Sequence, residues 1–64
     1  MKWIPVKEKL PDIPNDYLIT LRHLDGDYKV EQTMYVNDEW YGMKCRPSWQ
    51  VVAWQPLPKP YIKI

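Results

Sequence analysis

The stretch of sequence that decides the fold is residues 17–36, YLITLRHLDGDYKVEQTMYV. Within it, two runs of alternating apolar and polar residues flank Asp25-Gly26, a dipeptide typical of a two-residue type I′ hairpin turn. A turn of that length pairs Leu21 with Val30, so the stretch is predicted to form a hairpin with one apolar and one polar face. The predicted inner face holds Tyr17, Ile19, Leu21, His23, Tyr28, Val30, Met34 and Val36; the predicted outer face holds Thr20, Arg22, Lys29, Glu31, Thr33 and Tyr35.

Two further strands are predicted downstream of the hairpin. A three-residue loop at 37–39 places Trp40 on the inner face, whereas a loop one residue shorter places it beside the outward Tyr35. We prefer the longer loop because it buries Trp40. The third strand then extends from Trp40 to about Cys45. The fourth covers residues 49–54, whose apolar residues on both faces are typical of a strand covered on both sides.

All seven prolines lie outside residues 15–46. Because proline cannot donate to a β-ladder, it belongs at edges and in loops, so both ends of the chain are predicted to be extended arms. Residues 3–6 are expected to form a short edge strand, followed by a single helical turn at 7–10. The tail at 56–60, PLPKP, resembles a polyproline II ligand, and we expect it to fold back on the protein's own tryptophans, notably Trp3 and Trp54, rather than to serve as an SH3 ligand.

These elements predict a mainly β domain of 64 residues, a small antiparallel sheet or open barrel of four to five strands with proline-rich extended termini. A domain this small buries a limited share of its surface, so large aromatic side chains must supply much of its core. The predicted core consists of Trp3, Ile19, Leu21, Val30, Met34, Trp40, Val52, Trp54 and Leu57.

Charge and composition exclude several classes of protein. Nine Lys and Arg against eight Asp and Glu give a net charge of +1, which argues against a duplex-DNA binder and against a polybasic membrane anchor. No apolar run approaches the ~18 residues that span a bilayer, so we expect a cytoplasmic protein. With one Cys and one His, the chain has neither a disulfide nor a set of zinc ligands, and we expect no cofactor.

Enzymatic activity is the least expected function. His23 lies beside the first turn and Cys45 ends the third strand, so the pair is predicted to lie apart, as a hydrogen-bonded histidine and a structural cysteine. The acidic residues around Gly26 are typical of turn chemistry rather than of a metal loop.

A binding surface is predicted where aromatic and basic residues alternate. Such a pattern can provide hot spots for a protein partner or stacking platforms for nucleotides or single-stranded nucleic acid, although a solvated sheet face is the simpler explanation. The candidate residues are Arg22, Tyr35, Tyr41, Lys44, Arg46 and Trp49. A separate surface is residues 61–64, YIKI, which alternate like an edge strand and could pair with another copy of the protein.

Motifs at both ends of the chain and in its middle resemble a known family. Residues 3–11 read WIPVKEKLP, in the pattern W-I-x-V-x-x-x-L-P, and residues 52–60 read VAWQPLPKP, in the pattern x-x-W-x-P-L-P-x-P. Residues 35–40, YVNDEW, match Y-x-N/D-x-x-W. Together they resemble the small phage and prophage proteins grouped as domain of unknown function 551, over nearly the whole chain. Pro5 departs from the pattern, since Ser is more often expected there, at a position with no assigned role.

The resemblance implies a phage or prophage origin and a compact mainly β domain, and it supplies no catalytic residues. The leading hypothesis is therefore an accessory protein that binds a host protein in the bacterial cytosol and inhibits it sterically, through the outer sheet face or the loop from Arg46 to Trp49. One alternative is an oligomeric sponge for a nucleotide signal or single-stranded nucleic acid. A second is a structural or virion-associated protein.

Overall fold

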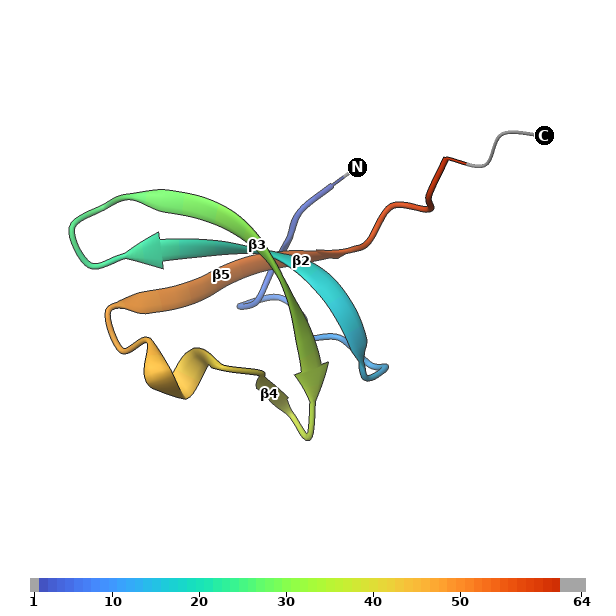
Figure 1. Ribbon diagram of the computed structural model, residues 1–64, viewed down its shortest axis with the longest axis horizontal. Helices are drawn as coiled ribbons and strands as arrows, with labels where there is room; N and C mark the ends of the chain where they lie inside the picture. Colours follow the sequence, from blue (N-terminus) through green and yellow to red (C-terminus); the bar gives the residue numbers. More distant parts are fainter. Residues whose placement is uncertain (1, 62–64) are drawn as a thin grey trace.

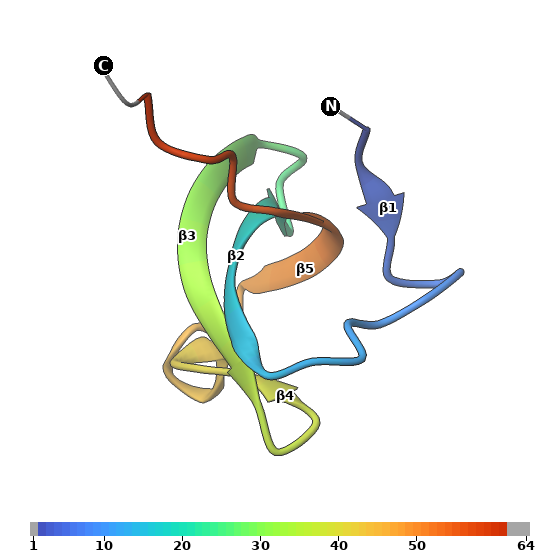
Figure 2. The same ribbon diagram turned by 90° about the vertical axis from the view of Figure 1, so that its right-hand side faces the viewer.

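The computed structural model describes residues 2–61 as one curled antiparallel sheet. The sheet has five strands in the order β1-β5-β2-β3-β4, so β1 and β4 form its two edges (Figures 1 and 2). The predicted mainly β class and antiparallel architecture are confirmed. The elements are β1 (Ile4–Pro5), β2 (Asn15–His23), β3 (Tyr28–Val36), β4 (Glu39–Trp40), the 3-10 helix η1 (Met43–Cys45) and β5 (Trp49–Pro56).

Strand β2 lies at the centre and pairs with both β3 and β5. Its alternating residues Tyr17, Ile19 and Leu21 are 7%, 1% and 0% exposed and form the middle of the core, as predicted. The register with β5 shifts between Thr20 and Leu21, which leaves Val52 of β5 without a direct partner in β2. Such a β-bulge bends a strand and increases its twist, and so contributes to the curl of the sheet.

The first hairpin turn is one residue longer than predicted. The backbone N–H of His23 donates to the Asp27 carbonyl at 2.7 Å, and that of Gly26 donates to the His23 carbonyl at 2.9 Å. Gly26 has φ 101°, so the loop Leu24–Gly26 has the form of a turn followed by a glycine bulge rather than a type I′ turn. Leu21 consequently pairs with Lys29, not with Val30.

This single residue inverts β3, because successive side chains of a strand point to opposite faces. Three residues predicted to lie inside, Tyr28, Val30 and Met34, are 63%, 57% and 46% exposed. Tyr35, predicted to face outward, is buried at 5% exposure. The prediction for this strand was therefore wrong on both faces. The residues that share the inner face with β2, by their pairing with Leu21, Ile19, Tyr17 and Asn15, are Lys29, Glu31, Thr33 and Tyr35.

The second turn is one residue shorter than predicted. Because the first turn is one residue longer than predicted, the two errors cancel for Trp40, which still lies on the inner face. Tyr35 pairs with Trp40 across a two-residue turn, Asn37-Asp38, whose φ angles of 53° and 62° are those of a type I′ turn. Since Tyr35 now lies inside, its partner Trp40 also lies inside. The Trp40 ring is half-buried and lies 4.6 Å from the ring of Tyr35 and 6.2 Å from that of Tyr17.

The third predicted strand is much shorter than expected. Strand β4 ends at Trp40, and Gly42, with φ 80°, leads the chain into η1 instead of continuing to Cys45 as a strand. The fourth predicted strand is confirmed as β5, which extends two residues further, to Pro56.

The front arm forms the predicted edge strand, but only over Ile4–Pro5 instead of residues 3–6, and a turn at 6–8 stands where a helical turn at 7–10 was predicted. Ile4 pairs with Trp54, and the backbone N–H groups of Glu8 and Lys9 both donate to the Pro5 carbonyl. The indole N–H of Trp54 donates to the Lys9 carbonyl at 2.8 Å, which fastens this arm to the core.

The C-terminal tail does not fold back on the tryptophans, contrary to the prediction. Residues 57–61 are exposed and extend away from the sheet (Figure 1), and Leu57, predicted as core, is 37% exposed. Trp3 and Val52 are half-buried. The strand predicted at 61–64 lies, beyond Tyr61, outside the described residues.

The observed orientation of β3 predicts that the same change, valine to threonine, affects stability differently at positions 30 and 51. Val30→Thr should lower the free energy of unfolding by less than about 0.5 kcal/mol, because the side chain lies in solvent. Val51→Thr, at a position 9% exposed, should lower it by about 1–3 kcal/mol, because a hydroxyl is buried there. Urea unfolding followed by tryptophan fluorescence measures both, and equal losses would favour the register with Val30 inside.

Candidate functional site

Trp49, the first residue of β5, is surrounded by polar and charged side chains from three other segments. Its ring meets that of His23, its partner in β2, edge to face with centroids 4.7 Å apart. The Lys29 ammonium lies 4.5 Å from the centroid of the indole, and the Arg46 guanidinium carbon lies 6.0 Å from it. Cations at such distances over an indole are attracted by its π-electrons and restrict its orientation.

Glu31 holds both cations in place. Arg46 donates to its two carboxylate oxygens at 2.6 and 2.8 Å, and the Lys29 ammonium lies 2.7 Å from one of them. The hydrogen bonds from Arg46 and then Lys29 lower the pKa of Glu31 from its ordinary 4.5 to about 2. Glu31 and Arg46 side chains are about one third exposed, at 33% and 30%. The cluster is therefore a fixed, partly hydrated network at the surface.

Short local hydrogen bonds bring Arg46 and Trp49 to this position. The Arg46 N–H donates to the Met43 carbonyl at 3.0 Å, and the Trp49 N–H donates to the Arg46 carbonyl at 3.0 Å. The Leu24 N–H donates to the Ser48 carbonyl at 3.1 Å, which ties the first hairpin loop to the start of β5. Two loops distant in sequence thus form one surface.

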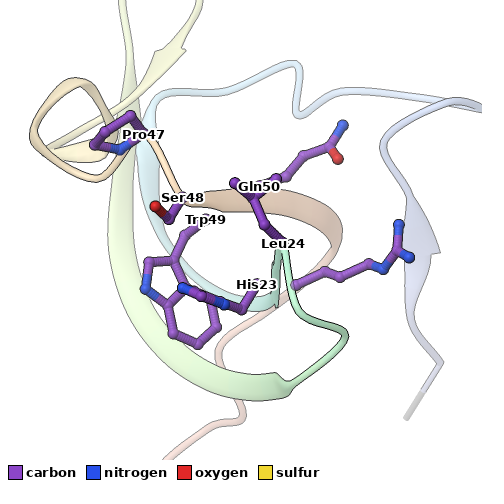
Figure 3. Close-up of a pocket in the computed structure, with 7 residues that line it drawn as sticks. His23, Leu24, Pro47, Ser48, Trp49 and Gln50 are labelled. Atoms are coloured by element: carbon purple, nitrogen blue, oxygen red, sulfur yellow. The ribbon is translucent and has the colours of Figure 1, made fainter.

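A hollow of about 360 Å³ lies where these loops meet (Figure 3). The rings of Trp49 and His23 lie side by side there, and Leu24, at the tip of the hairpin, is 82% exposed. His23 Nδ1 lies 2.7 Å from Asp25 Oδ1, and this hydrogen bond lowers the pKa of Asp25. The lining residues are Arg22, His23, Leu24, Pro47, Ser48, Trp49 and Gln50.

A second hollow, about 520 Å³, lies on the open side of the curled sheet. We call it the apolar groove. It is lined by residues of the front arm, of β4 and η1, and of the first part of β5. Its apolar residues are Val6, Leu10, Trp40, Met43, Trp49 and Val51, and its polar residues are Asp38, Glu39 and Gln50.

The structure brings five of the six predicted binding residues to the surface, in two groups. Arg22 borders the smaller hollow beside Trp49. Tyr41 and Lys44 border a third hollow with Arg46, on the other side of η1, and Tyr41 is 72% exposed. Tyr35 is the exception, because it is buried; burial, and secondarily the charge of Asp38, raise the pKa of its hydroxyl.

The roles of Glu31 and Lys29 were not predicted from the sequence. Their spacing of two residues, which puts opposite charges on one face of a strand, was the available signal. No spacing rule indicates that Arg46, fifteen residues beyond Glu31, would join them.

Among residues 2–61, no group of three His, Cys, Asp or Glu side chains lies close enough together to hold a metal ion. Cys45 is exposed and unbridged. In the same part of the chain, no helix has the length and apolar character needed to cross a membrane.

Comparison with known proteins gives one family match. The family model described as a protein of unknown function (DUF551) matches residues 2–61. Neither the curated proteins nor the solved structures contain a match.

The lowered pKa of Glu31 predicts a pH dependence of stability. Because Glu31 binds protons less readily in the folded state, its contribution is complete above its ordinary pKa of 4.5 and declines as the pH falls toward about 2. The Glu31→Gln variant should thus be less stable than the parent at neutral pH, and the difference should shrink across this interval. Urea unfolding at a series of pH values measures it.

Glu39→Gln is the matched control, because within residues 2–61 the Glu39 carboxylate has one ion-pair partner, the exposed Lys44, at 3.6 Å. Exposed ion pairs of this kind contribute about 0–1 kcal/mol to the free energy of unfolding. A difference between Glu31→Gln and the parent that stays constant down to pH 2 would contradict the assigned role of the carboxylate.

Proposed function

We propose that this chain, which belongs to the DUF551 family of proteins of unknown function, is a non-enzymatic domain that binds a partner protein through the surface around Trp49. The observation that carries the proposal is the restraint on the indole: Lys29 and Arg46, both held by Glu31, lie against it, and the ring of His23 packs on it. A side chain that is already ordered loses little conformational entropy on binding. Trp and Arg beside a hollow are also the residues that dominate binding energy at protein interfaces.

The neighbouring side chains extend this surface beyond the indole. Leu24 projects from the hairpin loop, and the Leu24–Ser48 hydrogen bond keeps that loop against the start of β5. Arg22 contributes an exposed guanidinium at the same hollow. An apolar tip, an ordered indole and an arginine around one depression would receive a protruding side chain of a partner.

The motifs that resemble phage and prophage proteins support a more specific form of the proposal. In that setting the domain is an accessory protein of the bacterial cytoplasm, and its partner is a host protein that it inhibits by occupying a functional surface. A small rigid domain with aromatic hot spots suits inhibition by steric occlusion, which needs no catalytic group.

The nucleotide-binding alternative receives less support from the geometry. Aromatic rings beside cations do suit base stacking and phosphate binding. However, Glu31 contacts both Arg46 and Lys29 at 2.6–2.8 Å, so its negative charge offsets one of their two positive charges, and these cations attract a phosphate less strongly than two free cations would. Native mass spectrometry of the purified protein separates the two proposals, since a sponge carries a small-molecule mass.

Two substitutions at the surface test the protein-binding proposal. Trp49→Ala and Leu24→Asp should each weaken binding to a captured host protein about ten-fold or more. The first removes the indole that anchors the contact, and the second places a negative charge in it. The control is Ile13→Asp, which also replaces an exposed aliphatic residue with aspartate. Ile13 is 66% exposed and precedes β2, whereas Leu24 follows the other end of that strand. Affinity capture from bacterial lysate identifies the protein, and calorimetry then measures each variant.

The partner that supports the proposal is retained by Ile13→Asp and lost by both Trp49→Ala and Leu24→Asp. Circular dichroism checks that each variant is folded, and Leu24→Asp, at an 82% exposed position, remains informative if Trp49→Ala unfolds. A partner that binds all three variants equally would contradict the placement of the contact.

A further inference from the structure

The apolar groove lies where the curled sheet fails to close. Strands β1 and β4 are the outer strands of the sheet, and each consists of two residues. The gap between them is lined by side chains from the front arm, from β4 and η1, and from β5. Two indoles border it, those of Trp40 and Trp49, and Leu10 at its rim is 45% exposed. A groove lined by aromatic residues is the kind of surface that receives proline-rich peptides.

The chain itself carries such a peptide. Residues 56–60 read PLPKP, and the segment after Pro56 is extended and exposed, ending in Tyr61 at 89% exposure. Proline-rich segments favour the polyproline II conformation and lose little entropy when they bind in it. The tail therefore has the conformational preference of a peptide ligand, yet it is exposed and is not bound to its own domain.

The tail is poorly placed to enter the groove of its own domain. β5 ends beside Tyr17, at the opposite end from Trp49, and the tail continues away from the sheet (Figures 1 and 2). To reach the groove of its own domain, the tail would have to reverse its direction within residues 56–60, where every second residue is proline. Proline-rich chains are stiff over several residues, so binding to a second molecule is favoured over folding back.

The charges of the tail and of the groove are complementary. From Pro56 to the end of the chain there are two lysines, Lys59 among them, and no acidic residue. The groove has the carboxylates of Asp38 and Glu39 at its border, and the Glu39 side chain is 57% exposed. An ion pair between a lysine of a proline-rich peptide and carboxylates at the border of the groove sets the orientation in which the peptide binds.

We propose that the tail of one molecule, residues 56–61, binds in the apolar groove of a second copy. The prolines and Tyr61 pack on Trp40 and Trp49, and Lys59 approaches Glu39. When each of two molecules inserts its tail into the other, the contact closes into a symmetric dimer. This contact overlaps the partner-binding surface at Trp49, whereas Leu24 and Arg22 of that surface lie outside the groove.

A charge-swap cycle tests the proposal in the full chain. Lys59→Glu and Glu39→Lys should each weaken self-association about three-fold, and the two together in one chain should restore it, since the pair re-forms with reversed charges. Lys2→Glu is the matched control: it makes the same charge change at an exposed lysine on the front arm and should leave association unchanged. Sedimentation equilibrium from micromolar to millimolar concentration measures each constant.

A peptide spanning residues 55–61 gives an independent readout. Added to the labelled protein, it should shift the indole N–H signals of Trp40 and Trp49 in NMR spectra and dissociate the dimer. The indole of Trp54, which is buried and donates to Lys9, should not move. A protein that stays monomeric at millimolar concentration overturns the proposal. So does a dimer that neither Lys59→Glu nor the peptide affects, because it must pair through another surface.

Discussion

Burial of one face of β2 is the constraint on which the rest of the molecule depends. Ile19 and Leu21 are the two fully buried side chains among the described residues, and β2 alone has a long neighbour on each side. Burial of an aliphatic side chain contributes about 1.5–3 kcal/mol, which is a large fraction of the stability of a domain this small. The outer strands β1 and β4 add only short pairings, so the aromatic rings around Tyr17 must hold them: Trp54 lies 5.1 Å and Trp40 6.2 Å from its ring.

The alternation of β2 predicted its inner face correctly, but the same reasoning failed on β3 because it depended on the length of one turn. Gly26 fits both a two-residue turn and a three-residue loop with a glycine bulge, and residues 28–36 alternate acceptably in either register. The observed register buries Tyr35 and exposes Val30, a choice made by the packing of Tyr35 against Trp40 rather than by local pattern. The early end of β4 has a similar origin, since Gly42 adopts φ 80° where a strand would need an extended residue.

Arg22, Arg46 and Trp49 of the candidate site were predictable from the sequence, but Lys29, Glu31 and the organisation of the site were not. Arg46 and Trp49 lie close in sequence and form one surface in the structure. Their arrangement is set by Glu31, whose contact with Arg46 depends on the short β4 and the turn through η1, features that sequence pattern did not indicate. Because Glu31 offsets one of the two positive charges of Lys29 and Arg46, the proposed binding would depend on shape and apolar contact more than on long-range attraction.

The pairing of Ile4 with Trp54 has a consequence for the order in which the chain folds. The front arm is made first, yet its partner strand lies fifty residues later, so β1 stays unpaired until the ribosome has released β5. The hairpin of β2 and β3 closes over the shortest loop and can form first, followed by β5 against β2. The indole N–H of Trp54 can then bond to the Lys9 carbonyl, so the front arm, although it precedes β2 in the sequence, can be fastened only after β5 has joined the sheet.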